Sequence, residues 1–314
     1  MSVWLITGGG GFIGRHVLRM VEREHADVVA LGRKCPDDWA ASHFVVADFD
    51  APETITRALQ DVQPDIVIHA AGRTPPADPE LLYRANTLAT IRLLDSLRTL
   101  RKPCRAVIAG SAAELGPVEI DALPVNEDHP SRPIEPYGLS KWLATCAGFA
   151  ARPPLEVVSA RIFNPIGPGQ PLNQAFGRFA ARLASLDASP LIVGDLEVRR
   201  DFIDVRDVAR ALILLAKLGR AGTLYHVGTG ESHRVGDGLD HLQRRAGRSI
   251  EVRIDPRFMG GSGPRDSRAD SRRLQEHTGW RAEIAWEQSL DDLWFEAVSR
   301  GPGLFHTPMD DQEA

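Results

Sequence analysis

The chain has little cysteine and no long apolar run. Cys35, Cys104 and Cys146 are odd in number and widely separated, which indicates neither a disulfide framework nor a zinc site and fits a reducing compartment. The first apolar run has only the length of a strand and ends at Gly8, so no signal peptide is expected. No apolar stretch reaches the length of a membrane-spanning helix. We therefore expect a cytoplasmic protein without a membrane partner.

An excess of charge of one sign is also missing. The 37 Lys and Arg and 42 Asp and Glu residues leave a net charge of −5, and no long basic run is present. Because nucleic-acid binding usually needs a basic patch, no nucleic-acid partner is expected. The ten histidines form no ligand pattern, so no metal is expected. At 314 residues, the chain can form one large domain or two smaller ones.

What the sequence does have is a glycine-rich turn near its start. An apolar strand over 3–7 leads into Gly8-Gly9-Gly10-Gly11-Phe12-Ile13-Gly14, and a helical pattern follows. Glycine in such a turn lets a diphosphate approach the backbone N–H groups at a helix N-terminus. The spacing Gly8-x-x-Gly11-x-x-Gly14 alone is a weak signal, and a bare turn is the alternative. Its place between a strand and a helix favours dinucleotide binding.

Strands and helices then alternate. Apolar strands are expected at 27–31, 44–47, 66–69 and 106–109, with helices at 52–60 and 79–100. Short apolar strands separated by helices predict an α/β fold, a Rossmann-type doubly wound parallel sheet. Ligands of such sheets bind beyond the carboxyl ends of the strands. The residues expected at these ends are Gly8, Arg33, Asp48, Ala71 and Ser111.

Arg33 and Lys34 indicate the cofactor. NAD-binding chains commonly carry an acidic residue about 20 positions after the glycine turn, where it binds the ribose hydroxyls. This chain has Gly32-Arg33-Lys34 there. Two cations suit a 2′-phosphate, so NADP(H) is preferred over NAD(H), and a merely solvated loop is the alternative. Asp48 could accept a hydrogen bond from the adenine or cap the turn that follows it.

Ser111, Tyr137 and Lys141 are the candidate catalytic residues. Ser111 follows the strand at 106–109, and Tyr137 and Lys141 share one face of a helix expected to open at Pro136. A tyrosine with a pKa of ~10 exchanges protons poorly at neutral pH. A cation one turn away would lower that pKa, and Ser111 could hydrogen-bond the substrate oxygen. Tyr-x-x-x-Lys also occurs by chance, but the upstream serine favours catalysis.

Together these motifs resemble the extended short-chain dehydrogenase/reductases, which are NAD(P)-dependent nucleotide-sugar epimerases, dehydratases and reductases. The resemblance runs from Val3 to about Leu293. It implies that Tyr137 is the acid/base, that Lys141 binds the nicotinamide ribose and lowers the pKa of Tyr137, and that Ser111 orients the substrate. The implied cofactor contacts are Gly8, Gly11, Phe12, Ile13, Gly14, Arg33, Lys34, Asp48, Phe49, Ala70, Ala71, Gly72, Asn86, Tyr137 and Lys141.

The resemblance also implies a nucleotide-diphosphate sugar as substrate. Asn164, Arg200 and Arg265 are the candidates for its diphosphate, because arginine binds diphosphates through paired hydrogen bonds. An exposed surface arginine is the alternative, above all for Arg265. A helix is expected at 172–186, and the nucleobase should be recognised within 172–191. Members commonly form homodimers through the helices after Pro79 and Pro136.

Two domains are expected from the same resemblance. The NADP(H)-binding domain would comprise 1–163 and 202–227, with residues 198–208 returning the chain to the sheet. A smaller, interleaved nucleotide-sugar-binding domain would comprise 164–201 and 228–300. Residues 301–314 are expected to form a frayed tail.

The residues after Ser111 bear on the reaction. Dehydratases of the family carry Thr-Asp-Glu where this chain has Ser111-Ala112-Ala113, and Glu114 would point away if the backbone were extended, so dehydration is not expected. Segment 161–207 most resembles the GDP-4-keto-6-deoxymannose type of reductase, although Ala113 departs from an Asp common there. The alternatives are an NDP-hexose 4-epimerase with tightly bound NAD and, from another class, a non-catalytic NADP(H)-binding redox sensor.

Overall fold

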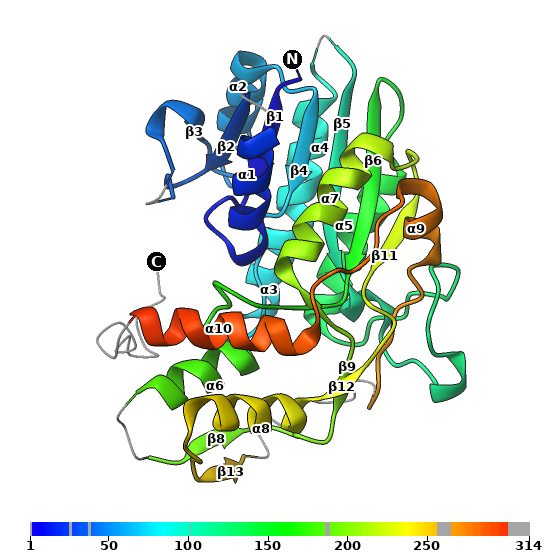
Figure 1. Cartoon of the computed structure of the whole chain (residues 1–314). Helices are drawn as coiled ribbons and strands as arrows, with labels where there is room; N and C mark the ends of the chain where they lie inside the picture. The colour runs from blue at the N-terminus through cyan, green and yellow to red at the C-terminus, as the bar shows by residue number, and fades with distance from the viewer. Residues whose placement is uncertain are drawn as a thin grey trace.

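A parallel sheet of seven strands forms the centre of the molecule (Figure 1). The computed structural model describes residues 2–24, 27–36, 39–100, 102–185, 189–255 and 265–300. The strands are β1 (Trp4–Thr7), β2 (Val28–Gly32), β3 (Phe44–Val46), β4 (Ile66–His69), β5 (Cys104–Ser111), β6 (Leu155–Ile162) and β11 (Leu224–Val227). Their order is β11-β6-β5-β4-β1-β2-β3, and every neighbouring pair is parallel. The predicted doubly wound sheet is confirmed.

Helices cover both faces of this sheet. One face packs against α1 (Phe12–Glu24) and α7 (Val205–Leu218), which lie side by side in Figure 1. The other packs against α2 (Pro52–Val62) and α4 (Ala89–Leu97). Because successive strand residues point to opposite faces, Leu5 belongs to one hydrophobic cluster while Trp4 and Ile6 belong to the other. The apolar strands are therefore buried on both sides.

The helix expected over 79–100 is present but is not uniformly α-helical. It consists of α3 (Pro79–Leu82), a π-helical segment (Tyr83–Leu88) and α4. Such π-helical insertions often mark functional sites, and here the segment carries Asn86. The helix opening at Pro136 is α5 (Pro136–Phe149), as expected.

A second group of elements lies below the sheet in Figure 1. It contains α6 (Ala175–Ala184), α8 (Val235–Ala246), α10 (Trp286–Arg300), and the paired strands β8 (Leu191–Val193) and β13 (Val252–Ile254). These elements share their own hydrophobic cluster. The helix expected at 172–186 is therefore α6, with a later start. The predicted domain limits stay a prediction, and the predicted tail lies outside the described residues.

One expectation about the chain path is met only in part. Residues 198–208 return to the central sheet through the side chains of Ile203 and Val208, which pack in the cluster on one of its faces, but they add no strand to it. Instead, β10 (Phe202–Asp204) pairs with β7 (Asn164–Ile166), and β9 (Arg199–Arg200) pairs with β12 (His233–Arg234). Phe202 packs in the cluster of the second group, since its ring stacks on Trp286. The next strand that the chain adds to the central sheet is β11.

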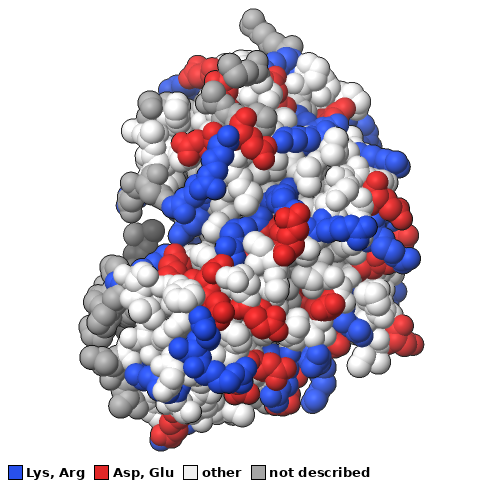
Figure 2. All heavy atoms as spheres, in the orientation of Figure 1, with Lys and Arg blue, Asp and Glu red and all other residues white. Residues whose placement is uncertain are grey.

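The remaining regular elements are short. They are α9 (Arg272–Thr278) and the 3₁₀ turns Ala41–His43, Ala112–Leu115 and Ile120–Ala122. Within the described ranges, no helix combines the length and apolar character needed to cross a bilayer. On the face shown in Figure 2, Lys and Arg side chains are interspersed with Asp and Glu.

Candidate active site

The glycine turn is packed too tightly for side chains. Gly8 has a φ of +70°, and a Cβ there would lie 2.6 Å from the backbone N of Ala71. A Cβ on Gly14 would lie 2.0 Å from the Gly8 carbonyl oxygen. The turn therefore rests against the end of β4, while Gly10 and Gly11 remain exposed at the N-terminus of α1. This exposed backbone is a cradle that suits a diphosphate.

A buried histidine ties the ends of β1 and β4 together. Thr7 Oγ1 lies 2.7 Å from His69 Nδ1 and accepts a hydrogen bond from the Ala71 N–H, and Thr90 Oγ1 lies 3.1 Å from His69 Nε2. Burial, with the charge of Lys141, lowers the pKa of His69 to about 3. The ring is therefore neutral and structural. It holds the loop Ala70–Gly72, the predicted cofactor contact, against the glycine turn.

Asn86 is 1% exposed and is satisfied by protein groups. Its Nδ2 donates to the Arg73 carbonyl at 3.0 Å and to Ser140 Oγ at 2.9 Å, and its Oδ1 accepts from the Arg73 N–H at 2.8 Å. These bonds join the loop after β4 to α5. Asn86 therefore positions this loop, and its predicted contact with the cofactor stays a prediction.

The residues predicted to meet the adenosine half lie at the carboxyl ends of β2 and β3. Arg33 and Lys34 are exposed directly after β2. Asp48 Oδ1 accepts a hydrogen bond from the Asp50 N–H at 2.9 Å, which is the turn cap, and its contact with the adenine stays a prediction. The Phe49 ring makes an edge contact with His69, with the ring centroids 5.6 Å apart.

The structure brings the three candidate catalytic residues together. Ser111 ends β5, and its side chain hydrogen-bonds that of Tyr137, in the first turn of α5. Lys141 Nζ donates to the Ala109 carbonyl at 3.0 Å. A Cβ on Gly72 would lie 3.2 Å from Lys141 Nζ, so the loop after β4 passes directly beside this group.

The expected effect of Lys141 on Tyr137 is not found. Burial raises the pKa of Tyr137 above its ordinary value, the hydrogen bond with Ser111 lowers it, and the charge of Glu114 raises it. Burial also lowers the pKa of Lys141 to about 8. Lys141 does not lower the pKa of Tyr137 because its ammonium group faces the Ala109 carbonyl and because burial removes solvent from both side chains. Tyr137 is therefore protonated at neutral pH in this structure.

The backbone after Ser111 is not extended, which corrects the reason given for excluding Glu114. Residues Ala112–Leu115 form a 3₁₀ turn, and Glu114 is completely buried against Arg161. Sequence reasoning missed both as partners of the site. The pattern Ser111-x-x-Glu114 is the sequence signature of a capping box, and from it the contact between Glu114 and Ser111 could have been predicted.

The candidate substrate residues also lie on neighbouring segments. Asn164 donates through its backbone N–H and its Nδ2 to the Asp201 carbonyl, at 3.0 and 3.1 Å. The Arg199 N–H donates to the Arg265 carbonyl at 2.9 Å, so the strand with Arg200 runs beside Arg265. Arg265 is exposed, whereas burial lowers the pKa of Arg200.

Asp201 was missed by the sequence analysis. Its buried carboxylate accepts hydrogen bonds from the Thr229 N–H and hydroxyl, the Gly230 N–H and the Ala269 N–H. It thereby ties residues 229–230 and 269 to the segment between β9 and β10. In the parts of the chain that the structure describes, no cluster of three or more His, Cys, Asp or Glu residues suits a metal.

Comparisons with known proteins agree with this geometry. Residues 4–228 match the NAD dependent epimerase/dehydratase family. The chain is 32% identical to the GDP-6-deoxy-D-mannose reductase of Pseudomonas aeruginosa, over 94% of this chain and 97% of the relative. It is 29% identical to the dTDP-6-deoxy-L-talose 4-dehydrogenase (NAD(P)(+)) of Kitasatospora kifunensis, over 92% and 93%.

Solved structures show the same likeness. The RMD structure from Pseudomonas aeruginosa complexed with NADPH superposes with a TM-score of 0.82 at 31% identity, covering 96% of this chain and 100% of that one. The Thermus thermophilus UDP-glucose 4-epimerase complexed with NAD gives 0.84 at 26% identity, covering 94% and 98%. The predicted family is thus confirmed: the chain belongs to the NAD dependent epimerase/dehydratase family and is an enzyme that uses a nicotinamide cofactor.

Proposed function

We propose that the protein reduces the C4 ketone of a nucleotide-diphosphate 4-keto-6-deoxyhexose with NADPH. The GDP-4-keto-6-deoxymannose type is the first candidate. The observation that carries the proposal is the convergence of Ser111, Tyr137 and Lys141 beside the loop after β4. Two curated relatives whose names describe a reductase and a dehydrogenase of 6-deoxy sugar nucleotides support it.

Tyr137 acts as the general acid in this account. Its raised pKa keeps the hydroxyl protonated at neutral pH, so it can give a proton to the oxygen that becomes an alkoxide at C4. The Ser111 hydroxyl donates a hydrogen bond to the same oxygen and stabilises its developing charge. Lys141 supplies positive charge close by. Bound NADPH would supply the hydride.

The cofactor would be held at the edge of the sheet described above. The exposed backbone of Gly10 and Gly11 would hold its diphosphate. Arg33 and Lys34 would hold the 2′-phosphate, which is why we propose NADPH rather than NADH. NADPH use also favours net reduction over epimerisation, because an epimerase returns its hydride to the same sugar and needs no supply of reduced cofactor.

The diphosphate of the sugar nucleotide would meet Arg200 and Arg265, with Asn164 beside them. Their backbones are held together by the hydrogen bonds to Asp201 and Arg265 described above. Ala112 and Ala113 supply neither the acid nor the base that a dehydration needs in addition to the tyrosine.

We further propose a homodimer acting in the cytoplasm. Exposed apolar side chains lie on α5 and the adjacent π-helical segment: Leu88, Leu139, Leu143 and Phe149. Burying them against a second copy would remove apolar surface from water. Light scattering on the wild type and on Leu143→Glu tests this, since the variant should be monomeric if the helices form the interface.

The reaction itself is tested by supplying NADPH with GDP-, dTDP- and UDP-linked 4-keto-6-deoxy sugars, with NADH in parallel. Consumption of NADPH with one of them and formation of the 4-hydroxy sugar supports the reductase. Interconversion of 4-hydroxy epimers without net NADPH consumption, by protein that retains its cofactor through purification, identifies the epimerase instead.

A further inference from the structure

A fully buried ion pair lies directly behind Ser111. Glu114 and Arg161 both have side chains that are 0% exposed, and Arg161 Nη2 lies 3.0 Å from Glu114 Oε2. Thr145 also donates to this oxygen. A buried ion pair seldom stabilises a fold more than apolar packing would, because both charges lose their hydration. Its position beside the catalytic candidates therefore calls for a reason other than stability.

The other oxygen of Glu114 acts on Ser111. Glu114 Oε1 accepts a hydrogen bond from the Ser111 N–H at 2.7 Å, and Ser111 Oγ accepts one from the Ala113 N–H at 3.2 Å. This reciprocal pair is a capping box. It fixes the backbone and the hydroxyl of Ser111 together. A Cβ on Gly110 would lie 2.4 Å from Glu114 Oε1, so glycine is needed there to admit the carboxylate.

Arg161 is itself held from other directions. It donates to Ser131 Oγ at 2.7 Å, lies 3.3 Å from His226 Nε2, and its guanidinium lies 5.7 Å from the centre of the Trp142 ring. Burial lowers the pKa of His226 to about 3. The ring is therefore neutral, donates from Nδ1 to the Val125 carbonyl at 3.0 Å, and can accept from Arg161 at Nε2.

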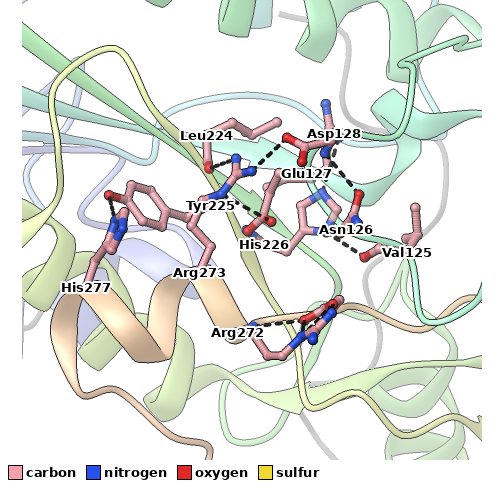
Figure 3. A network of polar contacts seen from close by, with 12 residues as sticks. Val125, Asn126, Glu127, Asp128, Leu224, Tyr225, His226, Arg272, Arg273 and His277 are labelled. Carbon is pink, nitrogen blue, oxygen red and sulfur yellow. Dashed lines mark hydrogen bonds and ion pairs between the residues drawn. The ribbon is translucent and has the colours of Figure 1, made fainter.

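Figure 3 shows the polar contacts around His226, which come from the 125–128 loop, β11 and α9. The His226 N–H donates to Glu127 Oε1 at 2.9 Å, and Arg273 lies between Glu127 and Asp128. The 125–128 loop, β11 and α9 are thereby linked behind Arg161. Glu114 thus faces Ser111 from a support that is hydrogen-bonded to several other segments.

We propose that Glu114, clamped by Arg161, is a positioning residue for the reduction: its carboxylate holds the backbone N–H of Ser111 and so, through the capping turn, orients the Ser111 hydroxyl, and its negative charge acts on Tyr137 and on Lys141. The proposal rests on the proposed function for its kinetic part. Its electrostatic part concerns groups already present in the free protein. Burial separates Glu114 from the solvent that would otherwise screen its charge.

The charge of Glu114 shifts the pKa of Tyr137 and the pKa of Lys141 in the same direction, upward. It raises the pKa of Tyr137 and opposes the fall in the pKa of Lys141 that burial causes. Among the described residues, the other charged or titratable groups around Glu114, Tyr137 and Lys141 are Arg161 on β6, His226 on β11, Cys146 on α5 and His69 on β4. Both histidines are neutral near neutral pH, so Arg161 is the cation that opposes Glu114 directly.

Three variants separate positioning from simple stabilisation. Glu114→Gln removes the charge but keeps one acceptor oxygen. Glu114→Leu combined with Arg161→Met removes the pair without leaving a buried unpaired charge, which protects folding. Asp207→Asn is the matched control, since Asp207 is a buried carboxylate paired with Arg210 on α7 and is not hydrogen-bonded to Ser111, Tyr137 or Lys141.

The kinetic readout is kcat at saturating NADPH. We expect Glu114→Gln to lower kcat and the double variant to lower it further, on the order of 10- to 100-fold, as for a misplaced catalytic group. NADPH affinity should stay within about twofold in all variants, and Asp207→Asn should keep the wild-type kcat. A folded double variant with wild-type kcat would overturn the proposal, because the pair would then be replaceable by apolar packing.

The second readout needs neither substrate nor cofactor. The near-ultraviolet absorbance of phenolate is titrated in the wild type, in Glu114→Gln and in Tyr137→Phe, which identifies the signal of Tyr137 among the three tyrosines. We expect Glu114→Gln to move this titration to lower pH, and the alkaline limb of the kcat profile with it. An unmoved titration would overturn the electrostatic part of the proposal, whether or not the wild type reduces a 4-keto sugar. A wild type that reduces no 4-keto sugar would overturn the proposed function alone.

Discussion

The ammonium group of Lys141 donates a hydrogen bond to the carbonyl oxygen of Ala109, 3.0 Å away. This bond places Lys141 at the end of β5, two residues before Ser111. It also directs the cation to the backbone rather than to Tyr137, whose pKa is raised by burial instead of lowered by Lys141. In the free protein, the tyrosine is therefore protonated at neutral pH.

Tyr137→Phe removes the hydroxyl group that is the proposed acid and keeps the aromatic ring. We expect kcat to fall on the order of 10²- to 10⁴-fold, as when a general acid is lost. NADPH binding, measured by fluorescence quenching, should remain, because the ring is retained. A variant that keeps more than a tenth of the wild-type kcat would exclude Tyr137 as the acid. A non-catalytic redox sensor would keep its function in this variant.

Arg33→Glu should change the choice of cofactor. If Arg33 meets the 2′-phosphate, this variant loses NADPH affinity by roughly 10- to 100-fold, the value of hydrogen bonds to a charged group, while NADH affinity changes little. Arg57→Glu is the control, since Arg57 is an exposed arginine on α2. Titration calorimetry with both cofactors measures the ratio. Equal losses for NADPH and NADH would mean that Arg33 does not recognise the phosphate.

Two glycines of the same turn should respond differently to alanine. A Cβ on Gly14 would lie 2.0 Å from the Gly8 carbonyl oxygen, whereas a Cβ on Gly10 finds its nearest neighbour, Pro36, at 3.7 Å. Gly14→Ala should therefore lower the free energy of unfolding by roughly 1–3 kcal/mol or more, as overpacking does, and Gly10→Ala should leave it nearly unchanged. Urea unfolding compares the two. Similar losses would show that the turn relaxes more easily than its contacts indicate.

Acid should destabilise the protein through its buried histidines. Burial lowers the pKa of His69 and of His226 to about 3, so in the folded state both stay neutral well below the ordinary histidine pKa. The unfolded chain binds protons at these residues below a pH of about 6.5, and stability is therefore lost as the pH falls from about 6.5 toward 3. Each histidine can contribute up to about 1.4 kcal/mol per pH unit.

His69→Asn tests this for one of the two histidines. The variant should be less stable at neutral pH, because its hydrogen bonds to Thr7 and Thr90 are weakened, but its stability should fall less steeply with acid. Substitution of the exposed His43 by Gln is the control. Urea unfolding at several pH values gives the slopes. An unchanged slope in His69→Asn would mean that another group takes up the proton.

The sequence was sufficient for those features that depend on neighbours in the chain. Apolar strands, the glycine turn and the helix opening at Pro136 follow from local patterns, and the parallel order places Ser111 and Gly72 at one edge. Features set by distant partners were not predictable in this way. The pKa of Tyr137 depends on burial, and the pairing of Glu114 with Arg161 joins residues 47 positions apart.

Asn86 and Asp48 illustrate the same limit. Both are predicted to contact the cofactor, and in the structure Asn86 also joins the loop after β4 to α5 while Asp48 also caps its own turn. A polar residue at a strand end or beside the groove can serve a ligand or the protein itself. The structure shows the second role, and the contacts with the cofactor stay predictions.

The most direct test follows NADPH absorbance while GDP-4-keto-6-deoxymannose is added to wild-type protein and to Tyr137→Phe. We expect stoichiometric NADPH oxidation and a C4 alcohol as product with the wild type, and on the order of 10²-fold or slower oxidation with the variant. Wild-type protein that binds both NADPH and the sugar nucleotide but oxidises no cofactor would contradict the assignment as a C4 reductase.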